Sequence, residues 1–134
     1  MKRTGAIVDG NDCAFCVWAP LKDKMHVHLL EPEDRLVEMD KVEEGYFEKR
    51  IKNLPPGSRY FFRPDDASDF PDPASNFQSE GVHGPSQNVD HTGFQWTDAS
   101  WNVPGFRELI FYELHVGTFT EEGTFNAIIP RLDD

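Results

Sequence analysis

The chain of 134 residues is long enough for one compact domain and a little more, and its 38% hydrophobic and 13% aromatic content is enough to build a core. The 13 Lys and Arg residues against 24 Asp and Glu give a net charge of −11, which argues against a nucleic-acid partner because phosphate-binding surfaces need clustered cations. The sequence has no run of about 18 apolar residues and no apolar segment behind its basic start. We therefore expect a cytoplasmic protein with no membrane span and no secretory signal.

The first half of the chain alternates apolar and polar residues in short stretches that Gly and Pro separate. In residues 24–30, for example, Met25, Val27 and Leu29 share one face of a predicted strand. The same reasoning predicts further strands at 6–8, 13–18, 35–39, 46–51, 59–63 and 88–96. Several short strands at regular spacing predict an all-β fold of the β-sandwich type.

The C-terminal part of the chain follows a different pattern. Residues 108–116 read as a buried strand, and Thr124 is a good N-cap for a helix that runs through Leu132. One strand and one helix cannot cover their own apolar faces, because a parallel strand needs neighbours on both sides. We therefore predict the first βα element of a truncated TIM-type barrel, which would make the chain part of a larger enzyme.

These patterns divide the chain into three parts. Residues 1–97 form the β-domain, 98–108 the linker, and 109–134 the first strand and helix of the barrel. Within the β-domain, residues 64–87 are rich in Pro, Asp, Ser and Gly. A loop of this length is uncommon inside a compact domain, so we expect an extended loop that docks against the barrel.

Two residue pairs have the spacing of metal or redox sites but are better explained as structure. Cys13 and Cys16 form a C-x-x-C, yet they lie in an extended apolar stretch whose positions i and i+3 point to opposite faces. Redox pairs of this spacing sit at helix N-termini, so we expect free, reduced thiols. His26 and His28 share a strand face, but no third ligand is visible, so we expect exposed polar side chains. No metal and no cofactor are predicted.

Four segments resemble one known group of enzymes. Residues 15–20 (FCVWAP) and 54–60 (LPPGSRY) resemble two motifs of the immunoglobulin-like (E-set) N-terminal domain in α-amylase superfamily enzymes. Branching enzymes, isoamylases and trehalohydrolases share both motifs. Residues 71–86 (PDPASNFQSEGVHGPS) are more specific and are similar to a run in malto-oligosyltrehalose trehalohydrolases. Residues 112–119 (YELHVGTF) resemble the first barrel strand of the same family.

The resemblance implies the activity of the larger enzyme. It would hydrolyse the α-1,4 bond next to the terminal trehalose unit of maltooligosyltrehalose and release trehalose, with one carboxylate as nucleophile and a second carboxyl group as acid. In this superfamily both groups lie on later barrel strands, so no catalytic residue is assigned here and the isolated chain is expected to be inactive. The β-domain would position and stabilise the barrel, its intramolecular partner.

A few residues are candidates for substrate contact. Trp96 and Trp101 lie in polar surroundings near the linker, where they could dock against the barrel or stack on a malto-oligosaccharide. His115 and Glu121 lie near the end of the predicted barrel strand and in the loop after it, the side on which barrel active sites form. Trp18, on an apolar strand, is expected to be packed. Two alternatives stay open, a branching or debranching (isoamylase-type) enzyme and a carbohydrate-binding module in its own right.

Overall fold

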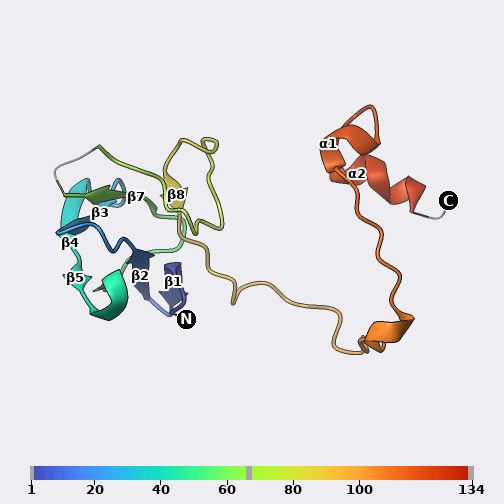
Figure 1. Cartoon of the computed structure of the whole chain (residues 1–134), viewed down its shortest axis with the longest axis horizontal. Helices are drawn as coiled ribbons and strands as arrows, with labels where there is room; N and C mark the ends of the chain where they lie inside the picture. Colours follow the sequence, from blue (N-terminus) through green and yellow to red (C-terminus); the bar gives the residue numbers. More distant parts are fainter. Residues whose placement is uncertain (1, 66–67, 133–134) are drawn as a thin grey trace. The chain divides into compact units, whose positions relative to one another are not determined.

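A computed structural model describes residues 2–65 and 68–132 of the chain (Figure 1). The chain divides into two compact units, Met1–Gln95 and Trp96–Asp134, and each is described by itself. The first unit is built mainly from strands, and the second from short helices and turns. The colours of Figure 1 run from blue to yellow over the first unit and to red over the second.

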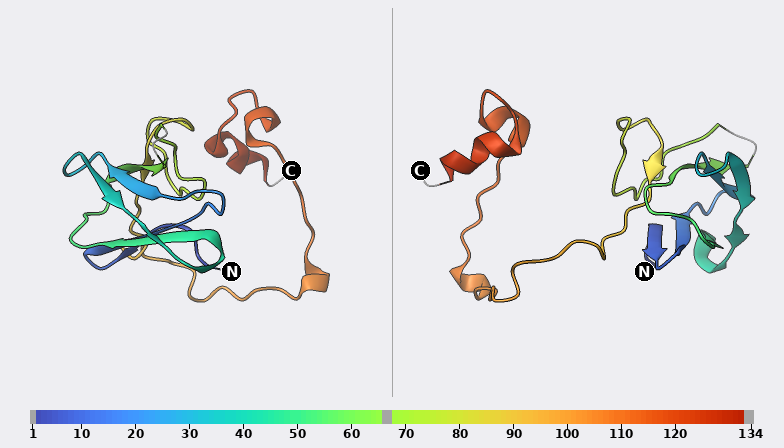
Figure 2. Two further views of the ribbon diagram at one scale, coloured as in Figure 1. Left: turned by 60° about the vertical axis from the view of Figure 1, so that its left-hand side comes forward. Right: turned by 180° about the vertical axis from the view of Figure 1, so that it is seen from behind.

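Two antiparallel sheets of four strands each form the framework of the first unit in the part that the structure describes. The first sheet has the strand order β1-β2-β6-β5 and the second β4-β3-β7-β8 (Figure 2). The strands are β1 Gly5–Asp9, β2 Asp12–Trp18, β3 Met25–Leu29, β4 Arg35–Glu38, β5 Asp40–Lys41, β6 Tyr46–Ile51, β7 Arg59–Pro64 and β8 Ser86–Gln87. A 3₁₀ turn, η1 Glu43–Gly45, leads into β6.

Side chains from both sheets pack into one core between them. In β3, Met25, Val27 and Leu29 are buried, as the alternation predicts. The ring of Phe15 from β2 meets the ring of Tyr60 from β7 edge to face, with centroids 4.9 Å apart. Because β2 and β7 belong to different sheets, this contact joins the two layers of the predicted β-sandwich. Other buried members of the cluster are Cys13, Val17, Met39, Phe47, Ile51, Leu54 and Phe62.

The last strand of the first unit lies earlier than predicted. β8 is Ser86–Gln87, paired with the first residues of β7, and no ladder extends over 88–96 in the described part of the chain. The pairing ends because β7 itself begins at Arg59, directly after a turn. In that turn, the N–H of Gly57 donates to the carbonyl of Asn88 at 3.0 Å. The prediction of a strand at 88–96 was therefore wrong.

Short helices and turns make up the second unit, namely η2 Phe106–Glu108, α1 Val116–Phe119, α2 Phe125–Ile128 and η3 Ile129–Arg131. The start of the last helix was predicted correctly, since Thr124 Oγ1 accepts a hydrogen bond from the N–H of Ala127 at 3.3 Å. The helix does not continue regularly to Leu132, because Pro130 has no N–H to donate and the chain tightens into η3. Among the described residues, no helix is long and apolar enough to cross a membrane.

The segment 108–116, predicted as a strand, forms no ladder in the described part of the chain. Residues 109–115 are irregular, and α1 begins at Val116. A strand is held by hydrogen bonds to a neighbouring strand, and none of the described segments pairs with this one. Its apolar side chains stay exposed, Ile110 at 96% and Tyr112 at 76%. The prediction of a strand here was wrong for this chain by itself, and the barrel element stays a prediction.

Candidate functional site

A buried polar cluster holds both ends of the segment between β7 and β8 against the sandwich. The hydroxyl of Tyr60 donates to Asp72 Oδ2 at 2.6 Å, and the backbone N–H of Asp72 donates to Ser86 Oγ at 2.9 Å. The second carboxylate oxygen of Asp72 accepts from the N–H of Ala74 at 2.8 Å. Tyr60, Asp72 and Ser86 are all buried. These contacts tie both ends of residues 72–86, which we call the tethered loop, to the sandwich that carries it.

Burial governs the charge states in this cluster. Desolvation raises the pKa of Asp72 above its ordinary value, although the hydrogen bonds from Tyr60 and Ala74 lower it in part. Desolvation also raises the pKa of Tyr60, and the nearby carboxylate of Asp72 adds to the rise. The phenol of Tyr60 therefore stays protonated and acts as a donor. Both groups are enclosed in the domain, so the pair is a structural tether and not an acid–base pair for catalysis.

A second polar cluster holds the chain just before the tethered loop. The ring of His28 lies between two carboxylates, with Nδ1 2.7 Å from Asp69 Oδ2 and Nε2 3.0 Å from Asp34 Oδ1. Arg63 donates to both carboxylate oxygens of Asp69, at 2.7 and 3.0 Å. The side chain of His28 is only 13% exposed, so the prediction of an exposed polar residue was wrong. The alternation of residues within β3 does not show that two loop residues, Asp34 and Asp69, contact His28.

The two cysteines point to opposite faces of β2, as predicted. Cys13 faces the core, Cys16 lies on the opposite face of β2, and both are free thiols. Burial raises the pKa of Cys13 to about 11, so its thiol stays protonated near neutral pH. No group of His, Cys, Asp or Glu in the part of the chain that the structure describes is arranged to hold a metal ion.

The tethered loop carries apolar side chains on its outer side. Phe77 is 51% exposed and Val82 73% exposed. Hydrogen bonds fix the backbone beneath them, because Gln78 Nε2 donates to the carbonyl of Val82 at 3.1 Å. The carbonyl of Phe77 accepts from the N–H of Gln87 at 2.9 Å. A loop with a fixed backbone and exposed apolar side chains can serve as a docking surface.

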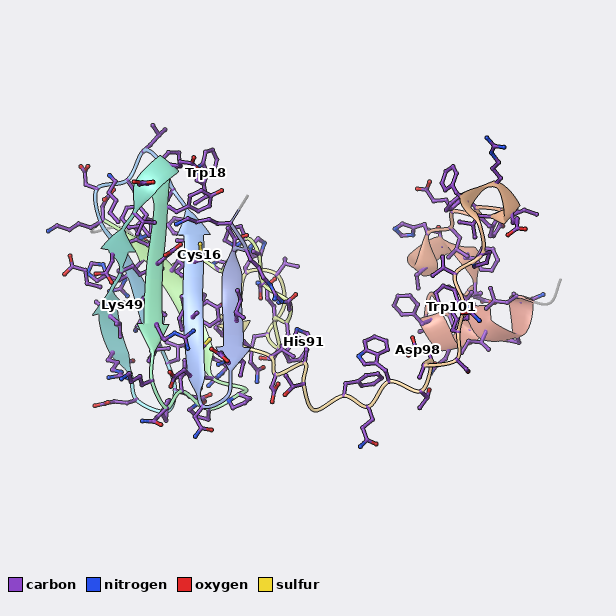
Figure 3. All side chains as sticks on the ribbon, turned by 90° about the horizontal axis from the view of Figure 1, so that it is seen from below. Cys16, Trp18, Lys49, His91, Asp98 and Trp101 are labelled. Carbon is purple, nitrogen blue, oxygen red and sulfur yellow. The ribbon has the colours of Figure 1, made fainter. Side chains whose placement is uncertain are left out.

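The structure places the four residues predicted to contact substrate at separate positions in the second unit. Trp96 and Trp101 are 74% and 65% exposed, and Trp101 is labelled in Figure 3. His115 lies directly before α1, with Nδ1 3.3 Å from Thr118 Oγ1. Glu121 lies on the wall of a hollow in the second unit. The described lining of that hollow includes none of the other three predicted residues.

The hollow beside Glu121 has a volume of about 1000 Å³. Glu121 and Glu122 are exposed on the loop between α1 and α2. An aromatic wall stands beside them, where the ring of Tyr112 meets that of Phe119 edge to face with centroids 6.3 Å apart. Two loop carboxylates beside an aromatic ring can accept hydrogen bonds from the hydroxyl groups of a ligand.

Trp18 was predicted to be packed, but it is 59% exposed. Phe15 and Val17 face the core, so Trp18, the next residue of β2, faces outward at the end of the strand (Figure 3). The strict alternation of β2 was the signal that could have placed it correctly. The apolar character of the strand does not show on which face position 18 falls.

Known proteins resemble this chain over most of its length. The chain is 39% identical over 129 residues to a malto-oligosyltrehalose trehalohydrolase from Saccharolobus solfataricus. It is 47% identical over 77 residues to an enzyme of the same name from Deinococcus radiodurans. The two matches cover 96% and 58% of this chain. The chain is a homologue of malto-oligosyltrehalose trehalohydrolases.

The trehalohydrolase relatives are much longer than this chain, which spans 22% of the Saccharolobus solfataricus enzyme and 13% of the Deinococcus radiodurans enzyme. An alpha-amylase family enzyme from Salmonella typhimurium, 34% identical, superposes with a TM-score of 0.82 over 98% of this chain and 22% of its own. A pullulanase from Bacillus acidopullulyticus, 19% identical, shares the fold of 66% of this chain with a TM-score of 0.59 and over 12% of its own length. No family model matches the chain.

Proposed function

We propose that this chain is the accessory β-domain of a trehalose-releasing glycoside hydrolase, together with the start of its catalytic barrel. The larger enzyme would hydrolyse the α-1,4 bond next to the terminal trehalose unit of maltooligosyltrehalose. The observation that carries the proposal is the 39% identity over 129 residues to a trehalohydrolase of which this chain spans 22%. A retaining glycosidase needs two carboxyl groups at the ends of barrel strands, so the role left to this chain is to support the barrel.

Exposed apolar side chains support the scaffold role. Ile110, Phe111 and Tyr112 follow one another and are 96%, 75% and 76% exposed. Contiguous exposed apolar residues are typical of surfaces that another part of a protein covers. Pairing of 109–115 with further barrel strands would bury them. Phe77 on the tethered loop would contribute to the same support, since it is held outward on a fixed backbone.

A chimera tests the proposal. In it, this chain replaces the 129 matched residues of the Saccharolobus solfataricus relative, and trehalose release from maltooligosyltrehalose is measured. We expect the chimera to release trehalose. The same enzyme without those residues, and this chain alone, should release none. A folded chimera without activity, or trehalose release by this chain alone, would contradict the proposal.

Paired variants of the chimera test the docking role of the tethered loop. Phe77→Asp places a charge on the loop surface, and Leu36→Asp places the same charge on β4 at a residue of similar exposure, 48% against 51%. If the loop supports the barrel, Phe77→Asp lowers the melting temperature and the activity of the chimera while Leu36→Asp leaves both unchanged. Equal effects of the two variants would show that this loop has no special role.

A further inference from the structure

The corner at the end of β2 carries two aromatic residues, the exposed Trp18 and the half-buried Tyr46. Trp18 is the last residue of β2 and lies directly opposite Tyr46, the first residue of β6. Their neighbours Val17 and Phe47 face the core, so both aromatic side chains lie on the outer face of the first sheet. Figure 3 shows Trp18 at the end of this sheet.

The indole of Trp18 is held in a fixed orientation. Its Nε1–H donates to the carbonyl of Glu44 at 3.1 Å. The turn η1 presents that carbonyl, and Glu44 and Gly45 both have positive φ there, 61° and 79°. A side chain at Gly45 would place its Cβ 2.6 Å from Pro20 Cβ, so only glycine fits. Because the ring is anchored before a ligand arrives, a ligand that stacks on it would immobilise little additional side-chain freedom.

A hollow of about 470 Å³ lies beside the indole. The described residues that line it are Lys2, Thr4, Trp18, Glu44 and Tyr46. Lys2 Nζ lies 5.7 Å from the centre of the Tyr46 ring and 2.7 Å from Glu48 Oε1. The hollow therefore has an aromatic wall, formed by Trp18 and Tyr46. The hydroxyl of Thr4, the ammonium group of Lys2 and the carboxylate of Glu44 also line it.

These walls match the two kinds of surface on a sugar ring. The C–H groups of a glucose ring form an apolar face that can stack on the electron-rich face of an aromatic side chain. The hydroxyl groups around its edge can hydrogen-bond to charged side chains such as Lys2 and Glu44, which line the hollow. An anionic ligand fits poorly, because Lys2 is already paired with Glu48 and the chain carries a net charge of −11.

A protein partner would need a larger surface. Stable protein interfaces bury about 800 Å² on each partner and involve about 20–30 residues a side. The described lining of this hollow consists of five residues. The hollow is of the size that suits one or two sugar units.

We propose that Trp18 and Tyr46 form a binding site for a linear α-1,4-linked glucan. The choice of an α-1,4 linkage rests on the proposed function, because the substrate of that enzyme carries such a chain. The site would hold the glucan part of a long substrate on the β-domain while the barrel acts near the trehalose end. Binding is by stacking and hydrogen bonds alone, with no covalent step.

An NMR titration of this chain with maltoheptaose tests the site directly. We expect saturable shifts at millimolar sugar for the Trp18 indole N–H and for the backbone amides of 44–46. Cellopentaose, a β-1,4-linked glucan, should produce weaker shifts at the same concentrations. An absence of shifts at these positions, or shifts confined to the second unit, would overturn the proposal. Equal shifts with cellopentaose would overturn the assignment of the linkage.

Three variants locate the binding energy. Trp18→Ala and Tyr46→Ala should each weaken maltoheptaose binding by about tenfold, because each removes an aromatic wall. Phe125→Ala is the control, since Phe125 is also an exposed aromatic residue, 77% against 59% for Trp18, but lies in the second unit. If Trp18→Ala does not fold, Tyr46→Ala and the shifts of the unmodified chain still decide the question. Unchanged affinity in folded Trp18→Ala and Tyr46→Ala would overturn the proposal.

The titration tests the binding site and the chimera tests the proposed function, so either proposal can be contradicted without the other. Glucan binding at Trp18 together with an inactive folded chimera would contradict the proposed function and leave the binding site in place. An active chimera together with no glucan binding would leave the proposed function in place and overturn the site. Burial of Trp18 in the chimera, measured as loss of fluorescence quenching by acrylamide, would show that the remainder of the enzyme covers this corner, which also overturns the site.

Discussion

The hydroxyl of Tyr60 and the carboxylate of Asp72 share a hydrogen bond of 2.6 Å inside the β-sandwich. Tyr60 belongs to the core of the domain, and Asp72 begins the tethered loop. The bond therefore makes the position of the loop depend on the packing of the core. A change at either residue is expected to loosen the loop and to lower the stability of the domain.

Tyr60→Phe is expected to lower the free energy of unfolding by about 1–3 kcal/mol, because it leaves the buried carboxylate of Asp72 with one donor fewer. Urea denaturation measures this loss. Tyr112→Phe is the control, since Tyr112 is 76% exposed and lies in the second unit. Equal stability of Tyr60→Phe and the unmodified chain would show that the hydrogen bond does not hold the loop.

The raised pKa of Asp72 predicts a pH effect on stability, with burial as its largest cause. A carboxyl group with a higher pKa in the folded state binds protons more readily there. Its contribution is therefore greatest in acid and is lost as the pH rises through the folded-state pKa. Asp72→Asn removes the titrating group and keeps its shape, so over that range the variant should lose less stability than the unmodified chain. Urea unfolding at a series of pH values measures the difference, and parallel curves would argue against it.

His28 predicts a pH effect in the neutral range. Desolvation lowers its pKa, but the hydrogen bonds to Asp34 and Asp69 more than offset this, so the folded-state pKa lies above the ordinary value of 6.5. The stabilising contribution is therefore complete below about pH 6.5 and is lost as the pH rises through the folded-state pKa.

His28→Gln should remove this contribution. The difference in unfolding free energy between the unmodified chain and the variant should be largest in mild acid and should shrink as the pH rises. His83→Gln, on the exposed part of the tethered loop, is the matched control. A difference for His28→Gln that does not depend on pH would contradict the role of the ion cluster.

Both thiols should resist modification in the folded chain. Cys13 is fully buried with a pKa of about 11, and Cys16 is 8% exposed with a raised pKa that burial also causes. A thiol reagent such as DTNB should therefore label them slowly in buffer and rapidly in urea, since the thiolate is the reactive form. Cys13→Ser isolates the response of Cys16. Rapid, stoichiometric labelling of the folded chain would refute this expectation.

Amide exchange should distinguish the strand predicted at 108–116 from the strands that form. Among the described residues, no N–H group of 110–115 donates to a backbone carbonyl, whereas β2 and β6 pair along their length. We expect rapid exchange at 110–115 and slow exchange in β2. The same amides should become protected in the chimera if they join a barrel sheet. Protection at 110–115 in this chain alone would be inconsistent with the structure.

Local pattern was sufficient for much of the fold. The alternation of Met25, Val27 and Leu29 predicts the buried face of β3, and the Thr124 side chain predicts the start of α2. Both features depend on neighbours within a few residues, which the sequence displays directly. The prediction of a strand at 108–116 failed because a strand also needs a partner strand, and this segment has none among the described residues.

The alternation of side chains, the positions of the turns and the family resemblance can all be read from the sequence. Which polar groups meet depends on the folded backbone. Tyr60 and Asp72 lie 12 positions apart, and His28 and Asp69 lie 41 positions apart. The physical reason is that burial periodicity is a property of a single strand, whereas a hydrogen bond between loop and core depends on where the folded backbone returns. The same reason explains why Trp18, on an apolar strand, stands exposed at a corner that the turn at Glu44 builds.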